Sequence, residues 1–163
     1  MKSKSMIIVL VLAVVLVAVG AFYSWHIFFS GAVNPPLKQS TLTIGNNSWT
    51  VEVASTMREQ TLGLSGRDSL GLEDGMFFIF GQPGTQNFWM IGMKFPLDII
   101  WIGGDKVLGF AENDPAPAPG TPTTSLKIYT SPDGTDEVLE VNAGTVAKAN
   151  IKVGDLVVLS PPD

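Results

Sequence analysis

A long apolar segment with one carboxylate inside it places the strongest constraint on the fold of this chain. The segment runs from Asn87 to Ile102, and its last part, Leu97–Ile102, is apolar at every position except Asp98. Apolar residues without alternation are typical of a strand that is covered on both faces. A buried carboxylate there needs a cation or several N–H donors as partners. We therefore expect a two-sided core and a polar network around Asp98.

The rest of the chain is rich in short strands and poor in helices. Within the apolar segment we expect two strands, at 88–91 and 97–102, joined by a link that contains Gly92 and Pro96. Further strands are expected at 41–44, 49–53, 76–80, 107–112, 127–129, 137–141 and 156–159. Thr56 and Glu59 form the pattern of a capping box, which predicts one short helix. A second helical turn is expected at 146–150. The pattern predicts a mainly β (α+β) fold, either a compact sheet or a partly open barrel with one or two short helices.

A run of 24 uncharged residues, Met6–Phe29, precedes this domain. About 20 apolar residues suffice to span a bilayer as a helix, and Lys2 and Lys4 before the run favour a cytoplasmic N-terminus. We expect a cytoplasmic N-terminus at 1–5, a transmembrane anchor at 6–29, a linker at 30–40 and an extracytoplasmic domain at 41–163. A signal peptide cleaved near Gly20 is the alternative, and a buried core helix is a third interpretation.

Composition excludes several classes of chemistry. The chain has no cysteine, and its one histidine, His26, lies in the apolar run, so thiol catalysis, disulfides, Ser-His triads and histidine-bound zinc are not expected in the domain. Lys2 and Lys4 precede the run, which leaves 8 basic residues against 15 acidic ones beyond it, a net charge of −7. Such a charge disfavours nucleic acid as a partner. No cofactor is indicated.

The candidate site residues are two strand carboxylates, one arginine and one tryptophan. Asp98 and Glu140 each lie within an expected strand, and two carboxylates held about 5–9 Å apart could hydrolyse a glycoside. Capping of backbone N–H groups or pairing with Arg58 is the structural interpretation of the same carboxylates. Trp89, with Phe88 and Trp101, could stack on a carbohydrate, although core packing is expected for aromatic side chains in apolar strands.

Two metal sites are also conceivable. Glu73 and Asp74 could contribute to a calcium site, but they lack the regular spacing of an EF-hand loop. Met76, Met90 and Met93 could bind Cu(I), but methionine in apolar strands usually fills core volume. No metal site is therefore assigned from the sequence.

Several motifs in a fixed order resemble one family. They are the helix 58–64, Gly75–Phe78, Phe88–Met90 followed by Pro96–Ile99, Val138–Gly144 and Val153–Asp155. This order is similar to the family called domain of unknown function 192, also named uncharacterised ACR, and the resemblance spans about residues 42–160. Where that family usually carries Trp-Met-Lys-Asn-Thr, this chain has Trp89-Met90 followed by Ile-Gly-Met-Lys-Phe. The resemblance implies a compact β-rich domain and assigns no activity.

Two functions are compatible with these observations. The first is a membrane-anchored extracytoplasmic binding or accessory domain, whose partner is an envelope component or a membrane protein. The second is a small carboxylate-dependent hydrolase of envelope polymers that uses Asp98 and Glu140. The absence of a nucleophile–base pattern in the sequence favours the first.

Overall fold

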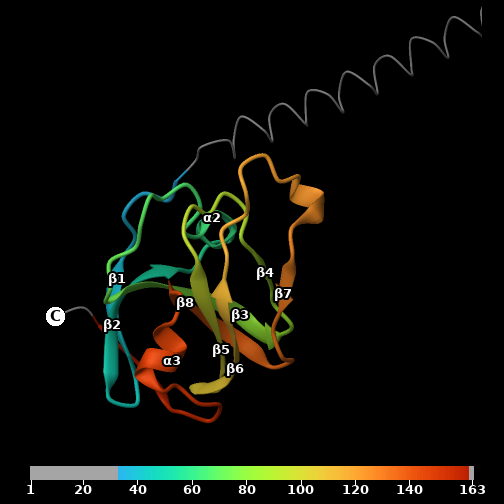
Figure 1. Cartoon of the computed structure of the whole chain (residues 1–163). Helices are drawn as coiled ribbons and strands as arrows, with labels where there is room; N and C mark the ends of the chain where they lie inside the picture. The colour runs from blue at the N-terminus through green and yellow to red at the C-terminus, as the bar shows by residue number, and fades with distance from the viewer. Residues whose placement is uncertain (1–32, 162–163) are drawn as a thin grey trace, which may run out of the picture. The chain divides into compact units, whose positions relative to one another are not determined.

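The computed structural model describes residues 33–161, which form one compact unit built around a curled seven-stranded sheet (Figure 1). The strand order is β6-β5-β8-β3-β2-β1-β9, and β4 and β7 form a separate two-stranded ribbon. The strands are β1 (Gln39–Ile44), β2 (Asn47–Ala54), β3 (Asp74–Gly84), β4 (Asn87–Trp89), β5 (Leu97–Gly103), β6 (Lys106–Asp114), β7 (Ile128–Thr130), β8 (Thr135–Asn142) and β9 (Val157–Ser160).

The sheet curls until its two edge strands meet at one end. Lys106 at the start of β6 forms a β-bridge with Leu156 just before β9. Two further backbone bonds join the edges, from Val107 N to the Asp155 carbonyl at 3.0 Å and from Val157 N to the Asp105 carbonyl at 2.9 Å. These contacts satisfy part of the exposed edges, so the sheet forms a half-barrel, which confirms the expected mainly β fold.

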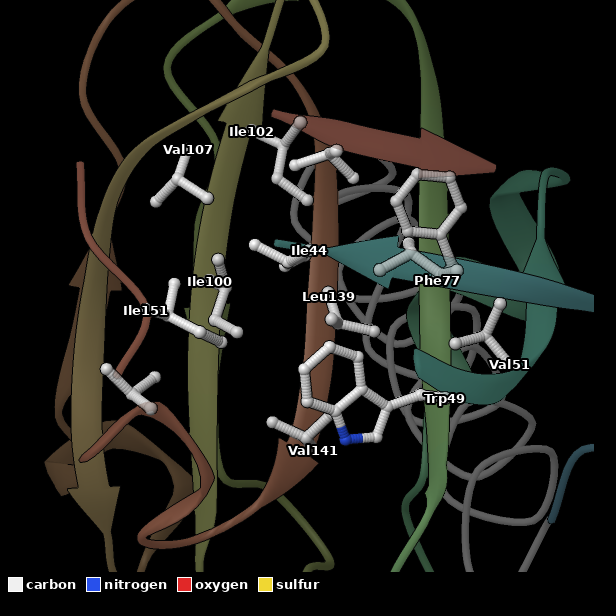
Figure 2. Close-up of a cluster of buried hydrophobic side chains, with 13 residues drawn as sticks. Ile44, Trp49, Val51, Phe77, Ile100, Ile102, Val107, Leu139, Val141 and Ile151 are labelled. Atoms are coloured by element: carbon white, nitrogen blue, oxygen red, sulfur yellow. The ribbon is translucent and has the colours of Figure 1, made fainter. Parts of the chain in front are cut away.

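Two hydrophobic cores lie on opposite faces of the sheet. The inner core fills the curl, and Figure 2 shows its side chains converging from β1, β2, β3, β5 and β8. The outer core lies between the central strands and the segments that cover them, and includes Met76, Phe78, Ile99 and Trp101. Every residue of β5 from Leu97 to Ile102 is buried, because β5 contributes to both cores. The two-sided burial predicted from its unbroken apolar run is confirmed.

The two α-helices of the described residues are short, and each has one buried side chain. Helix α2 (Met57–Leu62) begins with the predicted capping box, in which the Thr56 side chain accepts from Glu59 N and the Glu59 carboxylate accepts from Thr56 N. Helix α3 (Thr145–Ala149) places Val146 in the inner core. A single 3-10 turn, η1 (Thr123–Ser125), follows the proline-rich segment after β6.

The residues that precede β1 pack against the domain. Asn34 is buried, and its side-chain amide donates to the carbonyls of Glu59 and Gly63 at 2.9 and 3.0 Å. Leu37 packs on the outer core, and its N–H donates to the Glu52 carboxylate at 3.0 Å. Within the expected linker 30–40, residues from Asn34 onward are therefore held by specific contacts.

The expected membrane anchor lies outside the described residues. Within 33–161, neither α2 nor α3 nor any other helix has the length and apolar character needed to cross a bilayer.

The two strands expected at 88–91 and 97–102 belong to different sheets. β4 pairs with β7, with Phe88 opposite Tyr129, whereas β5 pairs with β6 and β8. The ribbon is held onto the outer core by Phe88, whose ring lies edge-on to those of Phe78, Phe80 and Trp101 at centroid distances of 5.1, 6.2 and 5.5 Å.

Candidate functional site

Asp98 is fully buried in β5 and binds three backbone N–H groups. Its Oδ1 atom accepts from Asn113 N at 2.7 Å and from Gly144 N at 3.1 Å, and its Oδ2 atom accepts from Val146 N at 2.8 Å. Asp98 therefore acts as a tertiary cap of backbone donors, which was the structural interpretation of this residue from the sequence.

The Asp98 network explains two local features of the chain. Helix α3 begins after Gly144, which has φ +82° and no side chain to cap the helix, so the carboxylate of β5 supplies the cap from a distant part of the sequence. On the other side, the β5–β6 register shifts between Leu97 and Ile99, and Asn113 lies in this bulge with φ +54°. One side chain thus fixes both a bulge of β6 and the start of α3.

Glu140 is also buried, but its environment is apolar. It lies in β8 between Met76 of β3 and Ile99 of β5, both of which are fully buried. Burial alone raises the pKa of the Glu140 carboxyl to about 8. This side chain is therefore protonated in the folded domain at neutral pH.

The structure does not bring Asp98 and Glu140 together. Asp98 is the ladder partner of Val141, and Glu140 is the partner of the next residue, Ile99. Since neighbouring residues of a strand point to opposite faces, Asp98 faces the inner core and Glu140 the outer core. The sheet separates the two carboxyl groups, so they do not form the acid–base pair that glycoside hydrolysis requires.

The two arginines have different positions. Arg58 lies exposed in α2, whereas Arg67 pairs with Glu52 of β2 through both guanidinium nitrogens, at 2.5 and 2.9 Å. Hydrogen bonding from Arg67 lowers the pKa of Glu52. Asp98 accepts hydrogen bonds from backbone N–H groups. The Arg67–Glu52 pair, which sequence reasoning did not single out, ties the loop after α2 to the sheet.

The aromatic candidates divide between core and surface. Phe88 and Trp101 contact each other in the outer core, as expected for aromatic side chains in apolar strands. Trp89 is 46% exposed on the ribbon, opposite Ile128 of β7, which is also exposed. Met76, Met90 and Met93 are buried in the outer core, which confirms their expected role as core-filling residues.

A third buried carboxylate, Asp114, lies at the end of β6 beside Tyr129 and Lys127. Burial raises the pKa of Asp114, and the nearby Tyr129 hydroxyl opposes that shift. The same burial, together with the Asp114 charge, raises the pKa of Tyr129 to about 12. The Lys127 ammonium lies 3.9 Å from Asp114 and 4.2 Å from the centre of the Tyr129 ring. This cluster fastens the ribbon to β6.

A polar pocket of about 450 Å³ lies against the segment that Asp98 holds in place. One wall is the β1–β2 turn with the start of β2, the second is Leu72–Glu73, and the third is the Asn142–Ala149 segment. Cross-links fix the walls: the Asn47 amide donates to the Ala149 carbonyl at 3.2 Å, and the Asn142 amide donates to the Gly71 carbonyl at 2.8 Å. Gly144 belongs both to this lining and to the Asp98 network.

Sequence reasoning did not predict this pocket. Asn47 and Asn142 lie in different walls of the pocket and are far apart in the chain. The local sequence at each of them predicts only a turn or the end of a strand. No spacing in the sequence reveals that both residues line one pocket. Within residues 33–161, no three acidic side chains are grouped so as to hold a metal ion, and this includes the neighbourhood of Glu73 and Asp74.

Solved structures that are similar to this chain include the following two. A protein of unknown function from Novosphingobium aromaticivorans is 35% identical, with a TM-score of 0.68, and the match covers 78% of this chain and 91% of that one. A protein from Sinorhizobium meliloti, described only as a candidate transcription regulator, is 26% identical with a TM-score of 0.69, over 77% of this chain and 97% of that one. No curated protein matches this chain.

The sequence comparison agrees with these structural matches. The family model described as uncharacterized ACR matches residues 40–159, which run from the second residue of β1 to the last but one of β9. The matched region holds the Asp98 network, Glu140 and every residue of the pocket. The chain therefore belongs to the family of domain of unknown function 192, the uncharacterized ACR family.

Proposed function

We propose that this protein is a membrane-anchored binding module whose β domain lies outside the cytoplasm and binds a component of the cell envelope. The uncharged run 6–29 supplies the anchor, and Lys2 and Lys4 give its orientation. The polar pocket beside α3 supplies the binding site. The observation that carries the binding part of the proposal is that Asn47 and Asn142 cross-link the walls of this pocket. Asp98, from outside the lining, holds Gly144 of the third wall in place.

Binding fits this site better than catalysis does. Asp98 has its oxygens engaged by three N–H groups, and Glu140 faces the other side of the sheet. A general acid–base mechanism needs two groups within reach of one substrate. A preformed pocket with fixed polar groups, in contrast, is what a binding module requires.

The charge of this chain gives no support to a nucleic acid as its partner. The residues beyond the apolar run carry a net charge of −7, with 8 basic and 15 acidic side chains. Phosphate backbones select basic surfaces. We therefore place the partner among envelope components.

Thermal unfolding of the full-length protein in detergent tests the binding function. A panel of glycans, cell-wall fragments, Ca²⁺ and Cu(I) is added, and a ligand at 100 times its dissociation constant stabilises the domain by about 2.7 kcal/mol. A shift with a glycan or cell-wall fragment supports the proposal. A shift only with a metal ion, or no shift together with crosslinking to a protein partner in the membrane, contradicts it.

The location is tested separately. Protease added to intact cells is expected to remove the domain, whereas complete protection until the cells are lysed would contradict the outside position. A variant with Lys2 and Lys4 replaced by glutamate is a useful comparison, because the positive charges before the run set its orientation.

A further inference from the structure

We propose that the pocket beside α3 takes an uncharged, hydroxyl-rich ligand, one or two sugar rings in size. This inference rests on the proposed binding function and specifies the chemical class of its ligand. It comes from the hydrogen-bonding groups that the pocket lining leaves available.

Two asparagines of the lining donate to backbone carbonyls, Asn142 with two bonds and Asn47 with one. The Asn47 Nδ2 atom donates to the Ala149 carbonyl, and the Asn142 Nδ2 atom donates to the carbonyls of Gly71 and Leu70 at 2.8 and 3.3 Å. These bonds fix the orientation of both amides, so each contributes its Oδ1 atom as an acceptor. A flexible amide could present either atom, but these two are held in one orientation.

Thr145 adds a third acceptor in the same pocket. Its hydroxyl donates to the Asn142 carbonyl at 2.6 Å, so its oxygen lone pairs remain for accepting. A ligand that fits such a lining must bring donors. Sugar hydroxyls provide such donors. A hydroxyl is also an acceptor, and the amide of the exposed lining residue Asn46 can donate to one.

The charges of the lining favour a neutral ligand. It contains one cation, Lys148, and one carboxylate, Glu73. Both residues are exposed, and their charges balance. A phosphorylated or strongly acidic ligand would find one ammonium group and several carbonyl acceptors in the lining. The domain around the pocket is acidic overall, so its charge also disfavours an anionic ligand.

Apolar surface beside these polar groups suits the C–H face of a sugar ring. Leu72, which is 85% exposed, lies at the same wall as Glu73. A volume of about 450 Å³ lies within the range of about 300–1,000 Å³ seen for small-ligand pockets.

Two matched variants in β2 separate the pocket from the rest of the surface. Ser48 and Thr50 are both exposed, and each faces a threonine of β1, Thr43 and Thr41 respectively. Only Ser48 lines the pocket. Ser48→Phe is therefore designed to fill the pocket without touching either core, and Thr50→Phe places the same side chain two residues away on the same strand.

The experiment is calorimetric titration of the full-length protein in detergent with cellobiose, maltose and N,N′-diacetylchitobiose. Glucuronic acid and triglycine serve as an anionic and a peptide probe. We expect at least one neutral disaccharide to bind, Ser48→Phe to weaken it at least about tenfold by loss of one or more hydrogen bonds and of space, and Thr50→Phe to bind like the wild type. Asn46→Ala is expected to weaken binding less, since one donor is lost.

The outcomes distinguish this inference from the proposed function. Binding of triglycine or glucuronic acid alone, sensitive to Ser48→Phe, overturns the sugar assignment and leaves the pocket as a binding site. Disaccharide binding that Ser48→Phe does not change overturns the pocket assignment and keeps an envelope-binding function. Failure of every probe, with no shift from cell-wall fragments either, overturns both.

Discussion

Asp98 and Glu140 lie one ladder position apart on neighbouring strands and point to opposite faces of the sheet. Asp98 enters the inner side, where three backbone N–H groups bind it, and Glu140 enters the outer side, where burial keeps it protonated. Two similar side chains thus have different roles because strand geometry assigns each to a different core. The predictions below follow from the contacts of such individual side chains.

Replacement of Asp98 by asparagine is expected to destabilise the domain by about 2–4 kcal/mol, because one of the two oxygens that accept from three buried N–H groups is replaced by an unmatched amide donor. Urea unfolding followed by circular dichroism measures the change. The control is Asp133→Asn in an exposed turn. Equal unfolding midpoints for the two variants would show that the Asp98 network is not structural.

Glu140 is expected to make the domain less stable as the pH rises. In the unfolded chain its carboxyl ionises near pH 4.5, whereas in the folded domain burial holds its pKa at about 8. Between these values the folded state binds one more proton, so the free energy of unfolding falls by about 1.4 kcal/mol per pH unit from this group, and below pH 4.5 the effect disappears.

The free energy of unfolding of the Glu140→Gln variant, compared with that of the wild type at each pH, measures this dependence. The variant is expected to match the wild type near pH 4.5 and to exceed it in stability at pH 8, because glutamine cannot ionise. Glu137, whose pKa is raised to about 7, contributes in the same direction in both proteins, so the difference between their stability curves isolates Glu140. Parallel curves across this range would contradict the assignment.

The Arg67–Glu52 pair is expected to couple energetically. A double-mutant cycle with Arg67→Met and Glu52→Gln should give a coupling free energy of about 1–2 kcal/mol, since both side chains are largely buried and the contact is bidentate. The pair should stabilise the folded state fully above pH 4.5, the pKa of Glu52 in the unfolded chain. This stabilisation should be lost as the pH falls through the lower pKa that Glu52 has in the folded domain.

The exposed pair of Lys94 and Asp68 is the comparison for that cycle. The same measurement with Lys94→Met and Asp68→Asn is expected to give no measurable coupling, because solvent screens the two charges. A coupling for Lys94–Asp68 as large as that for Arg67–Glu52 would contradict the role of burial.

Phe88→Ala is expected to cost about 2–4 kcal/mol and to loosen the β4–β7 ribbon, because one ring contacts Phe78, Phe80 and Trp101. Hydrogen exchange of the Tyr129 amide, opposite Phe88, reports the loosening. Trp89→Ala, one residue on and half-exposed, should cost less. If both variants lost the same stability, the ribbon would not be held by Phe88.

Local patterns in the sequence determined many of the elements. The hairpin of β1 and β2, the capping box of α2 and the two-sided burial of β5 each depend on residues close together in the chain, so their physical causes can be read locally. The order of motifs likewise gave the family. The uncharged run 6–29 and its flanking lysines predict an anchor on the same local basis.

The tertiary structure alone decided what these elements do together. The faces of the sheet that Asp98 and Glu140 occupy depend on the register of β5 against β8. The N–H groups that Asp98 accepts from belong to Asn113, Gly144 and Val146. The polar pocket is lined by Asn47, Glu73 and Asn142, which belong to segments far apart in the sequence. Long-range pairing, which no local propensity encodes, fixed the position and the chemistry of the candidate site.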